Sequence, residues 1–427
     1  MSDPASDPKR VIIVEPTHFG GPRGAALLTV LMPTLSIYLW ACLNRNGGAL
    51  ILPRSLAELR QLAALTPLPT ARAVMYFSGW LLLQVALRLY APGKTVQGMV
   101  QRDGRRLTYR MNGWASLWIS LAVLGGLFYS GLLPLTAIYD ELGGLLSTAT
   151  LFAFLFAIFL YFHGLRSKQE ERRSGNVIYD FFLGTSLNPR LGAFDLKVFF
   201  ESNIGMGCWG VFIVGMAAAQ YGKLGTLTTP MILVCALQLI YVADFFYFES
   251  TLLAMWDILY ENYGFMLVHA FLVWMPFNFS LQAQFLVTRS TALPAWAVVG
   301  CAVLFGVGYY IFRTANLQKY RFRTDPTLPI WGKPPSYLKT AHGSLLLTSG
   351  WWGKARHVNY LGDLMMALAM CLPCGLYHVA PFFYFIYFAP LLIDRERRDH
   401  ASCQAKYGKD WDEYCRRVPF RIIPRVY

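Results

Sequence analysis

Blocks of apolar residues alternate with charged connections along most of this chain. Each block has about the 20 residues that a helix needs to cross the hydrocarbon core of a bilayer. The blocks predict helices at 25–43, 73–91, 114–133, 145–164, 203–222, 228–249, 263–279 and 293–313, followed by two shorter runs at 364–378 and 379–393. The pattern therefore predicts an all-α, polytopic membrane protein with about ten transmembrane helices.

The composition supports that prediction. Hydrophobic side chains make up 55% of the 427 residues and charged side chains 15%, and the mean hydropathy is +0.39. These values lie outside the range of soluble globular domains. We expect a disordered tail at 1–24, which lacks a signal-peptide core, a transmembrane region at 25–313, and a C-terminal region at 314–427 that includes the last apolar hairpin.

The formal net charge of +14 is distributed unevenly. If both termini lie on one side of the membrane, that side carries nearly all Lys and Arg residues, in the stretches 94–110, 166–197, 313–356 and 395–425. This is the positive-inside asymmetry, so we expect both termini to be cytoplasmic, at the endoplasmic reticulum of a eukaryote or the inner membrane of a bacterium. The eight cysteines fall mostly in apolar helices or on the cytoplasmic side, so we expect free thiols.

The stretch 345–363 differs from an ordinary connection between membrane helices. It places two Trp, an Arg, a His, an Asn, a Tyr and an Asp between two apolar runs. Aromatic faces, cationic donors and a carboxylate at close spacing suit a large, flat, anionic ligand. The alternative is an interfacial loop with Trp at the level of the lipid headgroups. A second polar row follows on one face of a predicted helix that ends before Gly408, at Arg395, Asp399, Cys403 and Tyr407. This repetition favours a binding site.

Two short charge patterns lie close to these stretches. Lys319 and Arg323 are four residues apart on one helical face, where they can clamp a phosphate or contact lipid headgroups. Asp410 and Glu413 have the spacing of a capping box, which predicts the start of a short helix. The phosphate clamp and the lipid contact both stay open at this point.

One predicted membrane helix, 228–249, carries several polar residues. At about 100° per residue, four of them fall on a shared face: Gln238, Tyr241, Asp244 and Glu249. A carboxylate inside a membrane costs several kcal/mol and is rarely kept without a role, which favours a proton donor here. The alternative is a carboxylate that pairs with a neighbouring helix and only fixes its packing.

The sequence lacks the motifs of several common enzyme classes. There is no G-x-G-x-x-G after a predicted strand, no Walker loop, no H-E-x-x-H and no G-x-S-x-G. Rossmann dinucleotide binding, P-loop phosphate transfer, zinc proteolysis and α/β-hydrolase chemistry are therefore unsupported. No metal site is predicted.

The C-terminal third carries specific motifs. They are Leu347-Thr348-Ser349-Gly350-Trp351-Trp352-Gly353, Arg356-His357-Val358-Asn359-Tyr360-Leu361-Gly362-Asp363 and the run from Arg395 to Gly408, with a weaker match upstream at Tyr241-Val242-Ala243-Asp244. With these motifs the sequence resembles the sterol reductase family, which includes Δ14-sterol reductases, 7-dehydrocholesterol reductases, C24(28) sterol reductases and the membrane domain of the lamin B receptor.

The resemblance implies an NADPH-dependent membrane enzyme that protonates a carbon–carbon double bond of a sterol and delivers hydride to it. Among the possible double bonds, overall resemblance favours the one at C14. Carried over by motif, the expected NADPH contacts are Lys319, Arg323, Leu347, Trp352, His357, Asn359, Tyr360, Asp363, Arg395, Asp399, Cys403, Lys406, Tyr407 and Tyr414. The expected proton donors are Tyr241, Asp244 and Glu249, with Tyr414 as a rival. The expected partners are a sterol from the bilayer and membrane lipid, without nucleic acid and without an obligate protein partner.

Two segments depart from the family pattern and leave the substrate contacts open. The segment 202–205 stands where the family has Arg-Pro-Gly, and 269–271 replaces a segment of the Phe-Gly-Asp type. Two other functions also stay open. One is an isoprenylcysteine-type methyltransferase that uses S-adenosylmethionine, and the other is a non-enzymatic sterol-binding scaffold. Lys319 and Arg323 argue against the first, and the intact nucleotide motifs argue against the second.

Overall fold

The computed structural model describes residues 11–13, 18–100, 106–166 and 171–427, and divides the chain into two compact units. The first unit is Met1–Ser290 and the second is Thr291–Tyr427. The sequence placed a boundary at 313/314, but helix α14 (Ala295–Thr324) runs through that point and belongs to the second unit. No proline interrupts this helix, so it continues from its apolar part into its basic last turns.

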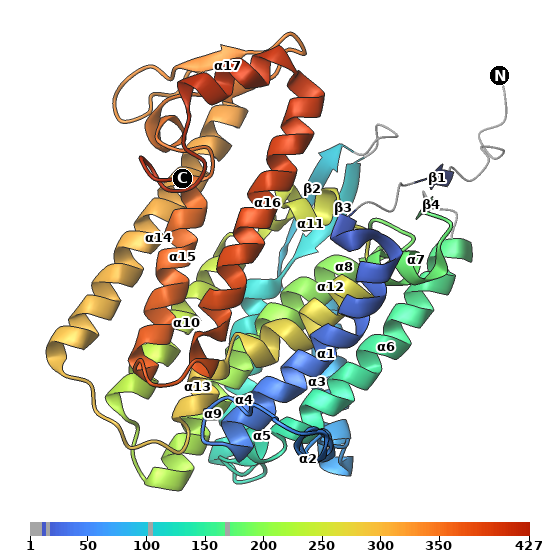
Figure 1. The fold of residues 1–427 in the computed structure, drawn as a ribbon, viewed down its shortest axis with the longest axis vertical. Coiled ribbons are helices and arrows are strands. Elements are labelled where there is room, and N and C mark those ends of the chain that lie inside the picture. Colours follow the sequence, from blue (N-terminus) through green and yellow to red (C-terminus); the bar gives the residue numbers. More distant parts are fainter. Residues whose placement is uncertain (1–10, 14–17, 101–105, 167–170) are drawn as a thin grey trace. The chain divides into compact units, whose positions relative to one another are not determined.

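The first unit is built mainly of helices, many of which run side by side (Figure 1). Its α-helices are α1 (Gly21–Arg45), α2 (Leu56–Ala64), α3 (Ala71–Tyr90), α4 (Gly113–Tyr129), α5 (Ala137–Asp140), α6 (Leu142–Arg166), α7 (Val177–Leu183), α8 (Leu196–Phe199), α9 (Gly207–Leu224), α10 (Thr229–Tyr247), α11 (Trp256–Leu259), α12 (Phe265–His269) and α13 (Leu281–Leu286). Short 3₁₀ segments are η2 (His18–Gly20) and η4 (Glu249–Ala254), and π-helical segments are η3 (Phe200–Met206) and η5 (Ala270–Asn278).

The strands of the first unit are short and form two-stranded pairs. Strand β1 (Val11–Ile13) pairs in parallel with β4 (Glu171–Arg173). Two pairs are antiparallel: β2 (Lys94–Val100) with β3 (Arg106–Met111), and β5 (Arg190–Leu191) with β6 (Phe194–Asp195). None of these pairs forms a sheet large enough to make a core, so helices dominate the fold.

The apolar helices agree with the predicted class. Among the described residues, seven helical stretches are long and apolar enough to cross a membrane, namely His18–Arg45, Ala71–Tyr90, Leu142–Arg166, Leu196–Leu224, Thr229–Tyr247, Phe265–Leu286 and Ala295–Thr324. Two shorter apolar stretches are Gly113–Tyr129 and Val358–Cys374. In a bilayer core only helices or closed barrels satisfy every backbone group internally. The prediction of an all-α, polytopic membrane protein is confirmed.

Two of these stretches contain π-helical turns that pack against each other. Segment η3 continues α8, and η5 continues α12. At Gly205 a side-chain Cβ would lie 2.9 Å from Met275 Sδ and 3.1 Å from the main-chain oxygen of Phe271. Glycine therefore permits the close approach of η3 to η5. Such π-helical turns occur often at functional sites, because the extra residue changes the direction of side chains.

The second unit consists of three long helices and a smaller cap of loops and short elements. Its α-helices are α14, α15 (Val358–Cys371), α16 (Phe383–Tyr407) and α17 (Lys409–Arg417). Its other elements are the antiparallel strands β7 (Tyr337–Lys339) and β8 (Leu345–Leu347), and the 3₁₀ segments η6 (Gly350–Gly353), η7 (Leu372–Cys374) and η8 (Ala380–Phe382). Within this unit α15 packs against both α14 and α16, and α17 follows the end of α16 (Figure 1).

Two glycines bring α14 and α15 into backbone contact. A Cβ on Gly362 would lie 2.5 Å from the main-chain oxygen of Gly308, and a Cβ on Gly308 would lie 2.6 Å from that of Gly362. These distances are too short for any side chain, so the pair sets the separation of the two helices. Lys319 lies near the end of α14 and His357 immediately precedes α15, so the distance between these two predicted NADPH contacts depends on the separation of the helices.

Three local predictions had different outcomes. Of the tail predicted to be disordered, residues 1–10 and 14–17 lie outside the described residues, whereas Val11–Ile13 form β1 and α1 begins at Gly21. Helix α16 ends at Tyr407, and Gly408 follows with φ = +53°, as expected. The predicted capping box is wrong, because Asp410 accepts a hydrogen bond from Ala341 N (2.7 Å) instead of capping α17.

Candidate functional site

A cation and an indole meet where α14 faces η6. Lys319 Nζ lies 4.1 Å from the centroid of the Trp352 ring, at cation–π distance. The indole is held in place, because Trp352 Nε1 donates a hydrogen bond to the main-chain oxygen of Ala315 (2.8 Å). Phe322 and Leu347 pack with Trp352 in one buried cluster. The surroundings therefore orient the ring before any ligand arrives.

A histidine and a carboxylate join the start of α15 to α16. His357 Nε2 lies 3.2 Å from Asp399 Oδ2, and the imidazole stacks on Tyr360 at 4.8 Å between centroids. Burial lowers the pKa of His357, although the hydrogen bond with Asp399 opposes this shift. Burial acts to raise the pKa of Asp399, but the bond with His357 and the nearby charge of Lys319 outweigh it, so the net shift is downward. Asp399 is thus held ionised beside a largely neutral imidazole.

The polar row of α16 continues into a cluster with α17. Cys403 Sγ lies 3.9 Å from Asp399 Oδ2, one helical turn away. Cys403 and Tyr407 pack against a buried group that includes Trp411 and Tyr414. Burial raises the pKa of Cys403 to about 12, so the thiol stays protonated and acts as a packing or donor group, not as a nucleophile.

Four other residues predicted to contact the cofactor lie on α15 and α16. Asn359 Nδ2 donates to Asn316 Oδ1 at 3.3 Å, while its buried Oδ1 has no hydrogen-bond partner among the described residues. Asp363 is buried one turn further along α15. Arg395 lies one turn before Asp399, and Lys406 Nζ lies 4.9 Å from the ring of Tyr407.

Arg323 and Lys319 share a face of α14, as the sequence predicted. In the described part of the chain, neither has a carboxylate within ion-pair distance. Two cations without a carboxylate at ion-pair distance among the described residues, one of them against a fixed indole, suit a ligand that carries phosphate and a flat ring. The residues present therefore fit a phosphorylated dinucleotide.

The buried ion network behind this cluster was missed by the sequence reasoning. Glu396 is fully buried on α16, with Oε2 2.8 Å from Arg421 Nη1 and Oε1 3.9 Å from Arg356 Nη2. Arg356 Nη1 also donates to the main-chain oxygens of Val418 and Pro419, at 2.9 and 3.2 Å. Glu396 stands in a run of six charged residues, from Asp394 to Asp399, and that run contains no signal for which member is buried.

This network ties the segment around His357 to α16. The main-chain N–H groups of Arg356 and His357 donate to Phe420 and Arg421 oxygens, at 3.0 and 2.7 Å. Glu396 lies one turn before Asp399, so the Arg356–Glu396 and His357–Asp399 contacts are two successive ties between the same segments. Breaking a buried pair leaves an uncompensated charge and costs several kcal/mol. Glu396 therefore positions His357 against Asp399.

The polar residues predicted on one face of 228–249 do not all share a helix. Helix α10 ends at Tyr247, and Glu249 opens η4, so the prediction of one continuous polar face is wrong at Glu249. Phe248 breaks the helix with φ = −103° and ψ = +26°. Gln238 is satisfied inside the bundle, since Trp209 Nε1 donates to its Oε1 and its Nε2 donates to Gln282 Oε1.

Glu249 belongs to a buried polar cluster between α3, α4 and η3. Its carboxylate accepts hydrogen bonds from Gly113 N (2.8 Å) and Ser202 Oγ (2.8 Å), and it lies 3.7 Å from Arg88 Nη1. Arg88, which the sequence reasoning missed, is also buried. A carboxyl group with this many partners is well placed to fix packing, and its burial raises the pKa of Glu249 against the opposing effect of Arg88.

Tyr241 and Asp244 remain on α10, both half-buried. The ring of Tyr241 lies 5.6 Å from that of Trp209. Tyr414 lies in the second unit, and burial raises the pKa of Tyr414. A raised pKa makes this phenol a weaker acid. Over the described residues, no group of three His, Cys, Asp or Glu side chains could hold a metal ion.

Taken together, these features define a polytopic α-helical membrane protein with a cation- and indole-lined site in its C-terminal unit. The profile of the ergosterol biosynthesis ERG4/ERG24 family matches residues 14–427, and the chain belongs to this family of sterol reductases.

Three relatives illustrate how far the similarity extends. A Delta(14)-sterol reductase of Methylotuvimicrobium alcaliphilum is 48% identical over 401 residues, which cover 94% of each chain. The Delta(14)-sterol reductase TM7SF2 of Mus musculus is 44% identical over 419 residues, covering 96% of this chain and 98% of the relative. A Delta(14)-sterol reductase of Dictyostelium discoideum is 38% identical over 421 residues, covering 95% and 91%.

Proposed function

We propose that this protein reduces the C14 double bond of a sterol and uses NADPH as the reductant. The observation that carries the proposal is similarity along nearly the whole chain to several proteins named Delta(14)-sterol reductase. The two cations of α14, which have no carboxylate at ion-pair distance in the part of the chain that the structure describes, and the oriented indole at Lys319 support a phosphorylated nucleotide as the second ligand.

The residues that would hold NADPH come from separate elements of the second unit. Lys319 and Arg323 would bind phosphate, and Trp352 offers a flat face at the same place. Asp399, kept ionised by His357 and the nearby cations, would accept hydrogen bonds from ribose hydroxyls. When bound, NADPH supplies the hydride that such a reduction needs.

The chain itself must supply a proton and a site that excludes water. One carbon of the double bond takes the proton from an acid of the protein, and the other receives the hydride, so the sterol gains two electrons and two hydrogens. Tyr241 and Asp244 on the apolar helix α10 are our candidates for the acid. Glu249 is less suitable because its carboxylate is held by Gly113 and Ser202.

We further propose a topology and a set of partners. Both termini would lie in the cytoplasm, at the endoplasmic reticulum of a eukaryote or the inner membrane of a bacterium, because an arrangement with both termini on one side gathers nearly all Lys- and Arg-rich stretches on that side. The sterol would enter from the bilayer, and membrane lipid would surround the helices. Neither nucleic acid nor an obligate protein partner is needed for this function.

Incubation of the purified protein with NADPH and sterols tests the proposal. We expect reduction of a Δ14-sterol and little reduction of Δ7- or Δ24(28)-sterols, with products identified by mass spectrometry. A parallel incubation with S-adenosylmethionine and an isoprenylated cysteine substrate tests the methyltransferase alternative. Turnover of a Δ7- or Δ24(28)-sterol in preference to the Δ14-sterol would overturn the C14 assignment, and no reduction of any sterol would overturn the reductase itself.

A further inference from the structure

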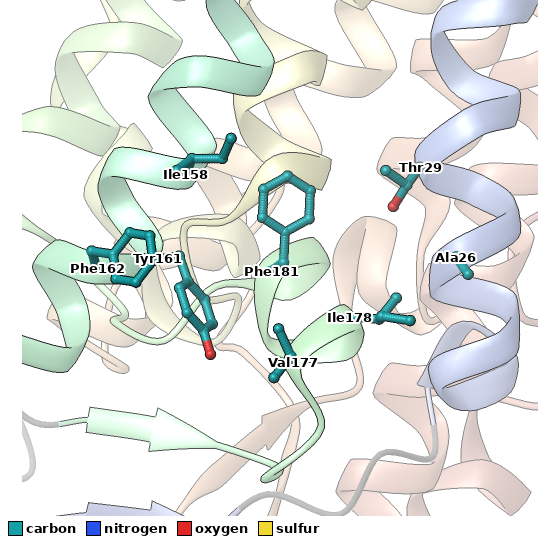
Figure 2. Close-up of a pocket in the computed structure, with 8 residues that line it drawn as sticks. All are labelled: Ala26, Thr29, Ile158, Tyr161, Phe162, Val177, Ile178 and Phe181. Carbon is teal, nitrogen blue, oxygen red and sulfur yellow. The ribbon is translucent and has the colours of Figure 1, made fainter.

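We propose that α1, α6 and α7 form a binding site for one anionic phospholipid. Its acyl chain would occupy an apolar cavity between these helices, and its phosphate would lie at Arg166. The cavity has a volume of about 460 Å³, within the range of about 300–1,000 Å³ typical of ligand sites. Figure 2 shows side chains of α1 across from those of α6, with α7 between them.

The lining of the cavity suits a hydrocarbon chain. It includes Ala26 from α1, Ile158 and Phe162 from α6, and Ile178 and Phe181 from α7 (Figure 2). Only two lining side chains carry a polar atom, the hydroxyls of Thr29 and Tyr161. The hydroxyl of Thr29 is already satisfied, because it donates to the main-chain oxygen of Ala25 at 2.7 Å. An acyl chain therefore enters without leaving the Thr29 hydroxyl unpaired.

A basic hollow adjoins this cavity. It has a volume of about 540 Å³ and is lined by Phe159, Phe162, His163 and Arg166, so Phe162 borders both spaces. The Arg166 guanidinium lies 6.0 Å from the Phe162 ring, and among the described residues no carboxylate is within ion-pair distance of it. His163 Nδ1 is buried and lacks a hydrogen-bond partner in the same part of the chain. The apolar space would take the acyl chain of a phospholipid, and the two basic groups beside it would take the phosphate.

The position of the site in the fold identifies the bilayer as the source of the ligand. Helices α1 and α6 belong to stretches long and apolar enough to cross a membrane. Phe162 and Ile178 are each 49% exposed beside the cavity, so its opening presents apolar side chains outward. Arg166 ends α6 on the side that carries most Lys and Arg residues, where anionic headgroups attract basic side chains.

Native mass spectrometry of the full-length protein in detergent tests the site. The protein is titrated with phosphatidylglycerol and with phosphatidylcholine of the same acyl chains. We expect at least fivefold tighter binding of phosphatidylglycerol. Arg166→Gln should abolish this preference and leave phosphatidylcholine binding unchanged, and Ala26→Phe should weaken both lipids by filling the cavity. Arg106→Gln, which removes an exposed arginine elsewhere, should change neither affinity.

The result also distinguishes other occupants. Equal affinities of the unaltered protein for both lipids, or an Arg166→Gln variant that behaves like Arg106→Gln, would overturn the proposal. Displacement of phosphatidylglycerol by a sterol that binds more tightly would also overturn it in favour of a sterol site. If Ala26→Phe does not fold, Ile158→Trp fills the cavity from α6 instead. None of these readouts depends on sterol reduction, so failure of the proposed enzyme activity leaves this test intact.

Discussion

The two cations on α14 are the side chains that, under the proposed function, would discriminate between NADPH and NADH. Lys319 is fixed against the Trp352 ring, whereas Arg323 is exposed one turn further along the helix. Among the described residues no carboxylate lies within ion-pair distance of this guanidinium, so under the proposed function it would be available to the phosphate that distinguishes NADPH from NADH. Under the proposed function both cations would bind phosphate, but with a division of roles: Lys319 would also lie at the indole ring, and Arg323 would contact the phosphate that NADH lacks.

Replacing Arg323 tests this division. Arg323→Ala should raise the KM for NADPH about tenfold or more and change the KM for NADH little, because a charge-assisted phosphate contact contributes roughly 1.5–3 kcal/mol. Steady-state kinetics with both cofactors measures the effect. Arg321→Ala removes an exposed arginine of the same helix and should leave both constants unchanged. Equal losses for NADPH and NADH in Arg323→Ala would rule out the phosphate assignment.

The proton donor can be separated from the nucleotide contacts in the same way. Asp244→Asn and Tyr241→Phe keep the shape of the side chain and remove its acidity, so the variant at the true donor should lose about 10²–10⁴ in single-turnover sterol reduction with NADPH binding intact. Asp399→Ala should instead weaken NADPH binding first. If Asp244→Asn and Tyr241→Phe both react like the unaltered protein, the donor is elsewhere, and Glu249→Gln and Tyr414→Phe become the next variants to measure.

The His357–Asp399 pair predicts a pH dependence of stability. Burial lowers the pKa of His357 below its ordinary value of 6.5, so the unfolded chain binds the proton more readily than the folded protein. Stability should therefore be fully present above about pH 6.5 and fall as the pH drops towards the lowered pKa, by at most about 1.4 kcal/mol per pH unit. Melting temperatures from about pH 5 to 8 measure this slope.

A variant assigns that slope to one histidine. His357→Gln keeps a hydrogen-bond donor for Asp399 but cannot titrate, so its melting temperature should vary less with pH over the same window. The matched control is His18→Gln, which replaces an exposed histidine and should keep the slope of the unaltered protein. A His357→Gln profile parallel to that of the unaltered protein would show that other groups cause the pH dependence.

At the scale of elements, the contact of α14 with α15 is the main determinant of the second unit. The Gly308–Gly362 approach leaves no space for a Cβ on either residue. Since Lys319 lies beyond this contact on α14 and His357 immediately precedes α15, the spacing of the helices controls how far the two side chains are apart. The close packing of these two glycines sets the distance between the two helices.

Alanine at these glycines should destabilise the protein despite its higher helix propensity. Gly362→Ala places a methyl group against the backbone of α14, and overpacking of this kind costs about 1–3 kcal/mol. Gly306→Ala is the matched control, because a Cβ there meets nothing within 4 Å and alanine favours the helix. Thermal unfolding in one detergent compares the two. A Gly362→Ala variant as stable as Gly306→Ala would contradict the close helix contact.

At the scale of the whole molecule, charge asymmetry should decide the orientation in the membrane. The positive stretches predict that Tyr427 and the connection 94–110 are cytoplasmic, while the connection that contains Asn46 and Gly47 faces the opposite side. Green fluorescent protein fused after Tyr427 should fluoresce, and alkaline phosphatase inserted at Gly47 should be active. The reverse pattern would show that the positive-inside rule does not describe this chain.

Local sequence patterns were enough to predict the class of the protein and several residues of its candidate site. Membrane helices are visible because the bilayer demands about 20 apolar residues regardless of tertiary contacts. The sequence also predicted cysteines without disulfides, and no disulfide joins the eight cysteines in the described part of the chain. The shared face of Lys319 and Arg323 followed from helical periodicity alone, and Gly408 marked the end of α16.

Which of these residues are in contact, and which charged side chains are buried, depends on tertiary packing. Glu396 is buried and the neighbouring Arg397 is exposed, although both stand in one charged run, because the packing of α16 against Arg356 and Arg421 selects one face. Glu249 left the predicted helical face because its hydrogen bonds to Gly113 and Ser202 cross more than 40 residues of sequence. Such long-range contacts leave no local pattern in the sequence. A helix, in contrast, leaves a periodic pattern, and a membrane-spanning segment leaves a long apolar run.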